Sequence, residues 1–102
     1  MIADLKQVQE IAVDLEHHST ESYLGFVCLM QISSRFKDYI IDVILLRADI
    51  YLLNEVFTDP KIVKVLHGAD FDVVWLQKDF GIYIVNMFDT GQVYNTLISL
   101  LL

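Results

Sequence analysis

Residues 11–18 read Ile-Ala-Val-Asp-Leu-Glu-His-His, an apolar segment that ends on two carboxylates two positions apart. The alternation predicts a β-strand over about residues 10–15, in which successive side chains point to opposite faces. Asp14 and Glu16 would then project together from one face. Two like charges held this close repel each other unless a cation lies between them. The pair therefore indicates half of a divalent-metal site, although a solvated strand end would give the same triplet.

The composition describes one small domain with an apolar excess. The 102 residues are 55% hydrophobic, with a mean hydropathy of +0.48. No apolar run reaches the roughly 18–20 residues that a membrane span needs, and the first residues do not resemble a signal peptide. We therefore expect no membrane partner. A sheet buried on both faces would explain the apolar excess, and so would a chain that is part of a larger domain.

The chain is acidic and contains one cysteine. Its 14 Asp and Glu residues outnumber its 7 Lys and Arg residues, which gives a net charge of −7. Such a field repels phosphates, so nucleic-acid binding would require bound metal ions or basic residues from elsewhere. Cys28 lies in an apolar run and has no cysteine partner. We expect a buried, intracellular thiol.

Hydrophobic periodicity predicts a mixed α/β sheet with flanking helices. We expect three strands first, at residues 10–15, 23–32 and 38–43, separated by turns at 17–22 and 33–37. We then expect a helix at 46–57, a strand at 61–66, a helix at 71–80 with Asp70 as N-cap and a left-handed Gly81 at its end, and a strand at 82–85. Asp89, with Gln92 three residues on, should cap a last helix whose apolar face is formed by Val93, Leu97 and Leu100. This order predicts an antiparallel meander followed by right-handed crossovers. The apolar ending, Ile98 to Leu102, predicts packing partners beyond this sequence.

A second group of acids follows the expected fourth strand. The segment 67–72 reads His-Gly-Ala-Asp-Phe-Asp, and ligands collect at the carboxyl ends of parallel strands. If the first and fourth strands are neighbours, Asp72 would lie beside Asp14 and Glu16. Three carboxylates suit Mg²⁺ or Mn²⁺ better than zinc. For Asp72 alone, a helix-start acid favoured by the helix dipole is the simpler interpretation.

Other polar and aromatic residues receive structural interpretations. We expect surface or turn positions for the adjacent His17 and His18, and a hydrogen-bonded strand-end position for His67. Asp42 and Asp79 are assigned to solvent or local capping. The aromatic residues Tyr23 and Trp75 are assigned to the core.

Several segments together resemble one family, the exosome-associated 3′→5′ exoribonucleases, which are relatives of ribonuclease D in the DEDD superfamily. The segments that carry the resemblance are Ala12–Ser19, Cys28–Ser33, Thr58–Pro60, His67–Asp70, Trp75–Gly81 and Asn86–Thr90. The resemblance implies a ribonuclease H-like fold with a mixed five-stranded sheet of order 3-2-1-4-5. It also implies that residues 1–102 form part of a single exonuclease domain, with the RNA exosome as a partner and a nuclear location.

The resemblance assigns roles to three acids. The family's first motif, Asp-x-Glu, falls on Asp14 and Glu16, and the acid of its second motif falls on Asp72. In the family these residues hold two divalent ions, Mg²⁺ or Mn²⁺, for two-metal hydrolysis at the 3′ end of single-stranded RNA. Bound metal ions would also reverse the repulsive local charge.

The sequence departs from the family at its third motif, Tyr-x-x-x-Asp. Downstream of Asp89 there is no Asp or Glu, and Tyr94 is followed four residues later by Ile98. We therefore expect a domain that is incomplete at its C-terminus. The loss of one carboxylate and one tyrosine from a catalytic unit predicts little or no activity for this chain. The alternative is a degenerate, non-catalytic nuclease fold that binds RNA or protein.

Overall fold

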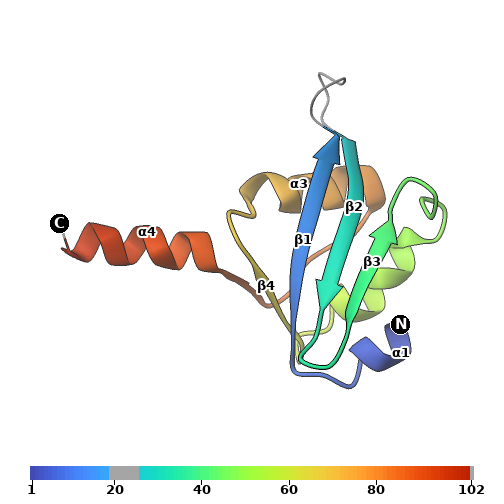
Figure 1. Cartoon of the computed structure of the whole chain (residues 1–102), viewed down its shortest axis with the longest axis horizontal. Coiled ribbons are helices and arrows are strands. Elements are labelled where there is room, and N and C mark those ends of the chain that lie inside the picture. The colour runs from blue at the N-terminus through green and yellow to red at the C-terminus, as the bar shows by residue number, and fades with distance from the viewer. Residues whose placement is uncertain (19–25, 102) are drawn as a thin grey trace.

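The computed structural model describes residues 1–18 and 26–101, with side-chain detail for 1–16 and 29–101. Within these ranges, five strands form one mixed sheet of order β3-β2-β1-β4-β5 (Figure 1). The strands are β1 Glu10–His18, β2 Phe26–Ser33, β3 Asp38–Asp42, β4 Val63–Leu66 and β5 Met87–Asp89. The helices are α1 Ile2–Leu5, the 3₁₀ helix η1 Ile50–Leu53, α2 Asn54–Phe57, α3 Asp70–Phe80 and α4 Thr90–Leu101. The expected fold and strand order are confirmed.

Strand β1 is the centre of the sheet. It pairs antiparallel with β2 and parallel with β4, with Asp14 opposite Gln31 and Ala12 opposite Val65. Strand β2 pairs antiparallel with β3, and β4 pairs parallel with β5. The neighbourhood of β1 and β4, on which the expected acid cluster depends, is therefore confirmed.

The two faces of the sheet differ in character. Ile11, Val13 and Leu15 of β1 are buried, as the alternation predicts. They belong to one core, to which strands β1 to β4 and the helices α1, η1, α2 and α3 contribute. Its fully buried members include Leu5, Ile11, Met30, Ile32, Val56, Phe57, Ile62, Leu76 and Ile82. The side chains between them on β1 are exposed, so the opposite face remains open to solvent.

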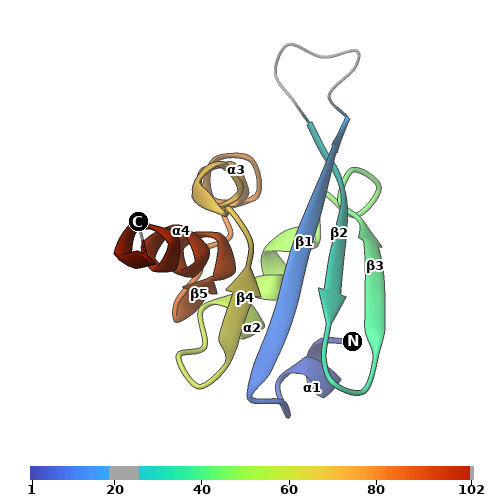
Figure 2. The ribbon, with the colours of Figure 1, turned by 60° about the vertical axis from the view of Figure 1, so that its left-hand side comes forward.

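Helix α4 has no buried residue. Figure 1 shows it extending away from the sheet, and Figure 2 shows it foreshortened, on the left of the molecule. Val93, Leu97 and Leu100, the apolar side chains expected to pack, are exposed. The helix is present where the sequence predicts it, but among the described residues its apolar face is left exposed.

The prediction of a helix at 46–57 is wrong for the first half of that range. Residues 43–49 form successive turns, and helical structure begins only with η1. Asp42 Oδ1 accepts the amides of Ile44 at 3.1 Å and Leu45 at 2.9 Å, which starts the turn. The Leu46 amide bonds four residues back to Asp42 O at 3.0 Å, but the Arg47 and Asp49 amides bond three residues back, to Ile44 O at 3.4 Å and Leu46 O at 2.8 Å. Three-residue spacing favours 3₁₀ geometry over an α-helix.

The prediction of a strand at 82–85 is also wrong, because β5 begins at Met87. Ile82 instead completes the end of α3: its amide donates to Leu76 O at 3.0 Å, after Gly81 in the left-handed conformation that the sequence predicts for it. The side chain of Asn54 then holds this segment through Gly81 O at 2.9 Å and Tyr83 N at 3.0 Å. A buried Ile82 and these bonds exclude sheet pairing here.

Strand β1 is longer than expected, since it continues to His18 and replaces the start of the predicted turn at 17–22. Strand β2 is described from Phe26, so the beginning of the expected strand at 23–32 lies outside the described residues. The assignments of Tyr23 and of the His17, His18 and Cys28 side chains also lie outside the described part of the chain. Trp75 is partly buried against the core, as expected.

Candidate functional site

Asp14 and Glu16 are held together by the strand that carries them. Both side chains are exposed, and the buried Val13 and Leu15 on either side of Asp14 fix which face they occupy. The pairing of β1 with β2 shifts register between Glu16 and His17, directly after the pair. Such irregularities often re-aim side chains next to active sites. The geometry confirms that two carboxylates project from one face of a central strand.

A hollow on the open face adjoins the first of these carboxylates. It has a volume of about 150 Å³ and is lined by Ala12, Val13, Asp14, Gln31 and Ser33. Its polar atoms belong to carboxylate, amide and hydroxyl groups. Exposed carboxylate oxygens suit Mg²⁺ or Mn²⁺, so the chemistry of the donors at Asp14 and Glu16 fits a divalent ion.

Asp72 lies at the corresponding end of the neighbouring strand. It occupies the first turn of α3, which follows β4, and its side chain is half-buried. Because β1 and β4 are parallel, Asp72, which follows β4, and the Asp14–Glu16 pair, in the second half of β1, lie toward the same edge of the sheet. Among the described side chains, however, no three of His, Cys, Asp and Glu lie close enough together to hold a metal ion. The structure unites Asp14 with Glu16 but does not gather Asp72 with them.

Asp70 is not the N-cap of α3. That position belongs to Ala69, which makes no side-chain capping bond, and Asp70 is the first helical residue. The carboxylate that serves the start of α3 comes instead from Asp89, at the end of β5. Asp89 Oδ1 accepts the Gly68 amide at 2.9 Å, and Oδ2 accepts the Ala69 amide at 2.8 Å.

The same carboxylate caps α4. Its Oδ1 also accepts the amides of Gly91 at 2.8 Å and Gln92 at 3.2 Å, which confirms the expected capping role. Asp89 is buried, with 7% of its surface exposed. Hydrogen bonds from the Ala69 and Gly68 amides, and then from Gln92 and Gly91, hold the pKa of Asp89 below its ordinary value of 3.8 despite the opposing effect of burial.

Thr90 connects the same two chain segments. Its Oγ1 donates to Leu66 O at 3.2 Å and lies 2.9 Å from His67 Nδ1. These two contacts of one hydroxyl tie the end of β4 to the start of α4. His67 is thus a hydrogen-bonded residue at the end of a strand, as the sequence predicts.

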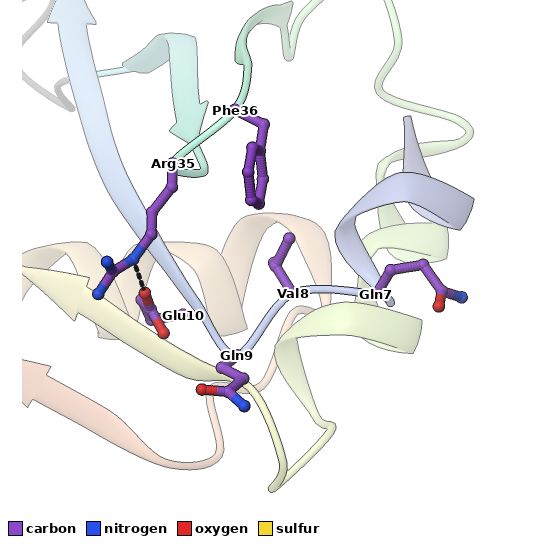
Figure 3. Close-up of a pocket in the computed structure, with 6 residues that line it drawn as sticks. All are labelled: Gln7, Val8, Gln9, Glu10, Arg35 and Phe36. Atoms are coloured by element: carbon purple, nitrogen blue, oxygen red, sulfur yellow. Dashed lines mark hydrogen bonds and ion pairs between the residues drawn. The ribbon is translucent and has the colours of Figure 1, made fainter.

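Two larger hollows lie elsewhere, near the beginning of β1. One, of about 380 Å³, is lined by Gln7, Val8, Gln9, Glu10, Arg35 and Phe36 (Figure 3). Glu10 and Arg35 form an ion pair across it. The second, of about 340 Å³, adjoins it and includes Tyr39, whose hydroxyl donates to Asp4 at 3.0 Å. In the second hollow Lys37 Nζ lies 5.2 Å from the centroid of the Tyr39 ring, so the charged groups of both hollows are engaged in contacts within the protein.

The fold, the strand order and the exposed acid pair define a nuclease-like domain. The model of the 3′-5′ exonuclease family found in DNA polymerase A matches residues 1–101. The chain therefore belongs to the 3′-5′ exonuclease family.

Individual relatives are more specific. The chain is 67% identical over 88 residues to exosome complex component 10 of Homo sapiens, a match that covers 86% of this chain and 10% of the relative. It is 60% identical over 90 residues to the exosome complex exonuclease RRP6 of Saccharomyces cerevisiae, covering 88% of this chain and 12% of that protein. The chain spans about a tenth of the length of these curated relatives.

A solved structure agrees with the fold. The catalytic core of RRP6 from Trypanosoma brucei superimposes with a TM-score of 0.82 at 62% sequence identity, over 87% of this chain and 25% of that one. Across the described residues, no helix combines the length and apolar character required to cross a membrane.

Proposed function

We propose that residues 1–102 are the metal-binding part of a 3′-5′ exoribonuclease domain that acts on the 3′ end of single-stranded RNA. The observation that carries the proposal is the exposed Asp14–Glu16 pair on the central strand of a chain in the 3′-5′ exonuclease family. The family resemblance, rather than the geometry, supplies RNA as the substrate. The similarity to proteins named exosome components supports association with the RNA exosome, while a nuclear location stays a prediction.

Each acid has a distinct part in this proposal. Asp14 and Glu16 provide carboxylates whose orientation the buried side of β1 fixes, and Asp72 provides a third from the start of α3. Two divalent ions held by such acids, Mg²⁺ or Mn²⁺, supply Lewis acidity and charge neutralisation at a scissile phosphate. The net charge of −7 opposes RNA binding by the protein alone.

The third motif of the family bears on whether this chain can cleave RNA by itself. The sequence after Asp89 contains no acid, and Tyr94 is followed by Ile98 where the motif would have Asp. We therefore expect this chain to bind RNA through metal ions while cleaving it slowly or not at all.

The test is binding and shortening of a 5′-labelled single-stranded RNA with and without Mn²⁺. We expect fluorescence anisotropy to detect Mn²⁺-dependent binding that Asp14→Asn removes, and gels to show little or no shortening from the 3′ end. Asp42→Asn is the matched control, because it neutralises a carboxylate that serves only a turn after β3. Binding that is indifferent to both Mn²⁺ and Asp14→Asn would contradict the proposal.

A further inference from the structure

The strand ends at residues 66–69 and 89–92 form one hydrogen-bonded unit, which we term the strand-end junction. A single carboxylate, that of Asp89, accepts four backbone amides, two at the start of α3 and two at the start of α4. Two helix N-termini thus face one negative charge, an arrangement that both helix dipoles favour. The N-cap residue of α3, Ala69, makes no side-chain capping bond of its own.

The two segments also approach each other very closely. A Cβ added to Gly91 would lie 2.9 Å from the backbone nitrogen of Gly68 and 3.3 Å from its Cα. Backbone atoms cannot move aside as a flexible side chain would, so a larger residue at 91 would push the strand ends apart. Gly68 itself has φ of +63°, which glycine adopts without strain.

Both apolar packing and hydrogen bonds hold the start of α3, because its N-cap Ala69 is fully buried in the core and Val73 packs partly against that core. Leu76 is the buried residue of this helix, and it lies beyond the first turn. Ala69 is also bonded on both sides: its amide donates to Asp89, and its carbonyl accepts the Val73 amide at 2.9 Å. The hydrogen bonds from Gly68 and Ala69 to Asp89 of β5 therefore act together with this packing to fix the turn that carries Asp72.

We propose that Asp89 is a positioning residue, which fixes the start of α3 through the Gly68 and Ala69 amides and so sets where Asp72 stands relative to Asp14 and Glu16. The inference rests on the proposed metal-binding function. A residue that only capped α4 would not affect the position of α3, so this role differs from local capping. Gly91 shares the role, because it permits the approach that these hydrogen bonds require.

The experiment is a Mn²⁺ titration of the chain, followed by the electron paramagnetic resonance signal of free Mn²⁺, well below each variant's melting temperature. Asp89→Asn removes the charge and one acceptor, so we expect a loss of affinity of about tenfold or more, the usual cost of losing an outer-shell partner. Gly91→Ala should weaken binding as well, although alanine is the better helix former for α4. Asp42→Asn, which removes another turn-capping carboxylate, should leave affinity unchanged.

Amide hydrogen exchange adds a readout that does not involve metal. In Asp89→Asn and Gly91→Ala we expect faster exchange at Gly68 and Ala69, with protection in β1 retained. Wild-type Mn²⁺ affinity in a folded variant whose Gly68 and Ala69 amides exchange rapidly would overturn the inference. If Asp89→Asn does not fold, Gly91→Ala decides the question in the same way. If Asp14→Asn itself leaves Mn²⁺ affinity unchanged, the proposed metal site is wrong and the inference is overturned with it.

Discussion

Replacing Leu76 by alanine should cost the domain a large part of its stability. Leu76 is fully buried and is the buried side chain through which α3 packs on the core. The substitution removes three carbon atoms, worth about 0.8 kcal/mol each. The cavity left behind raises the expected loss to about 3–5 kcal/mol, against roughly 5–15 kcal/mol for a domain of this size.

Val74→Ala on the same helix is the matched control. Val74 is 55% exposed, so its truncation creates no cavity, and alanine is the better helix former. We expect a change within about 0.5 kcal/mol. Urea denaturation followed by circular dichroism measures both variants. With a slope of about 1–1.5 kcal/mol per molar urea, Leu76→Ala should lower the midpoint by roughly 2 M or more. A loss below about 1 kcal/mol, or an equal loss in Val74→Ala, would refute the assignment of Leu76 as the anchor of α3.

Three further predictions concern the junctions between elements. The folded-state pKa of Asp89 is lowered, so its contribution to stability is complete above the ordinary value of 3.8 and is lost as pH falls below it. Urea midpoints measured from pH 5 to pH 2 should therefore decline less in Asp89→Asn than in the unmutated chain. Gly81→Ala should cost about 1 kcal/mol, because φ is +65° while the space around it is open, and thermal melts should detect this. Asn54→Ala should increase hydrogen exchange at Tyr83, whose amide donates to Asn54 Oδ1, whereas unchanged protection would contradict that bond's role.

The sequence predicts the sheet because its signals there are local. The alternation in β1 identifies both the buried face and the exposed acid pair. Gly81 predicts the end of α3, because a glycine in the left-handed conformation is a local signal that ends a helix. The family resemblance adds the strand order, which periodicity alone leaves open between several mixed sheets.

The failures arise where distant contacts override local pattern. Residues 82–85 have the β-branched composition of a strand, but Ile82 is taken into the core and the Asn54 side chain binds the following amide. The apolar spacing of 46–57 favours a helix, yet Asp42 directs the preceding amides into turns.

The strand-end junction is also beyond local reasoning. Asp89 and Gln92 predict a cap for α4, but no spacing rule connects Asp89 to Gly68 and Ala69, 20 residues away. The glycines at 68 and 91 were the available signal, since two backbones approach each other there. The position of Asp72 depends on this junction, so its relation to Asp14 could not be predicted from sequence alone.

Direct Mn²⁺ binding to the Asp14–Glu16 pair tests the central claim most directly. The signal of free Mn²⁺ would be followed during titration of the unmutated chain, Asp14→Asn, Glu16→Gln and the control Asp42→Asn. The account predicts saturable binding that either site substitution weakens by at least tenfold and that the control preserves. Equal binding in all four proteins would contradict the account, because the exposed pair on β1 would then be an ordinary solvated strand end.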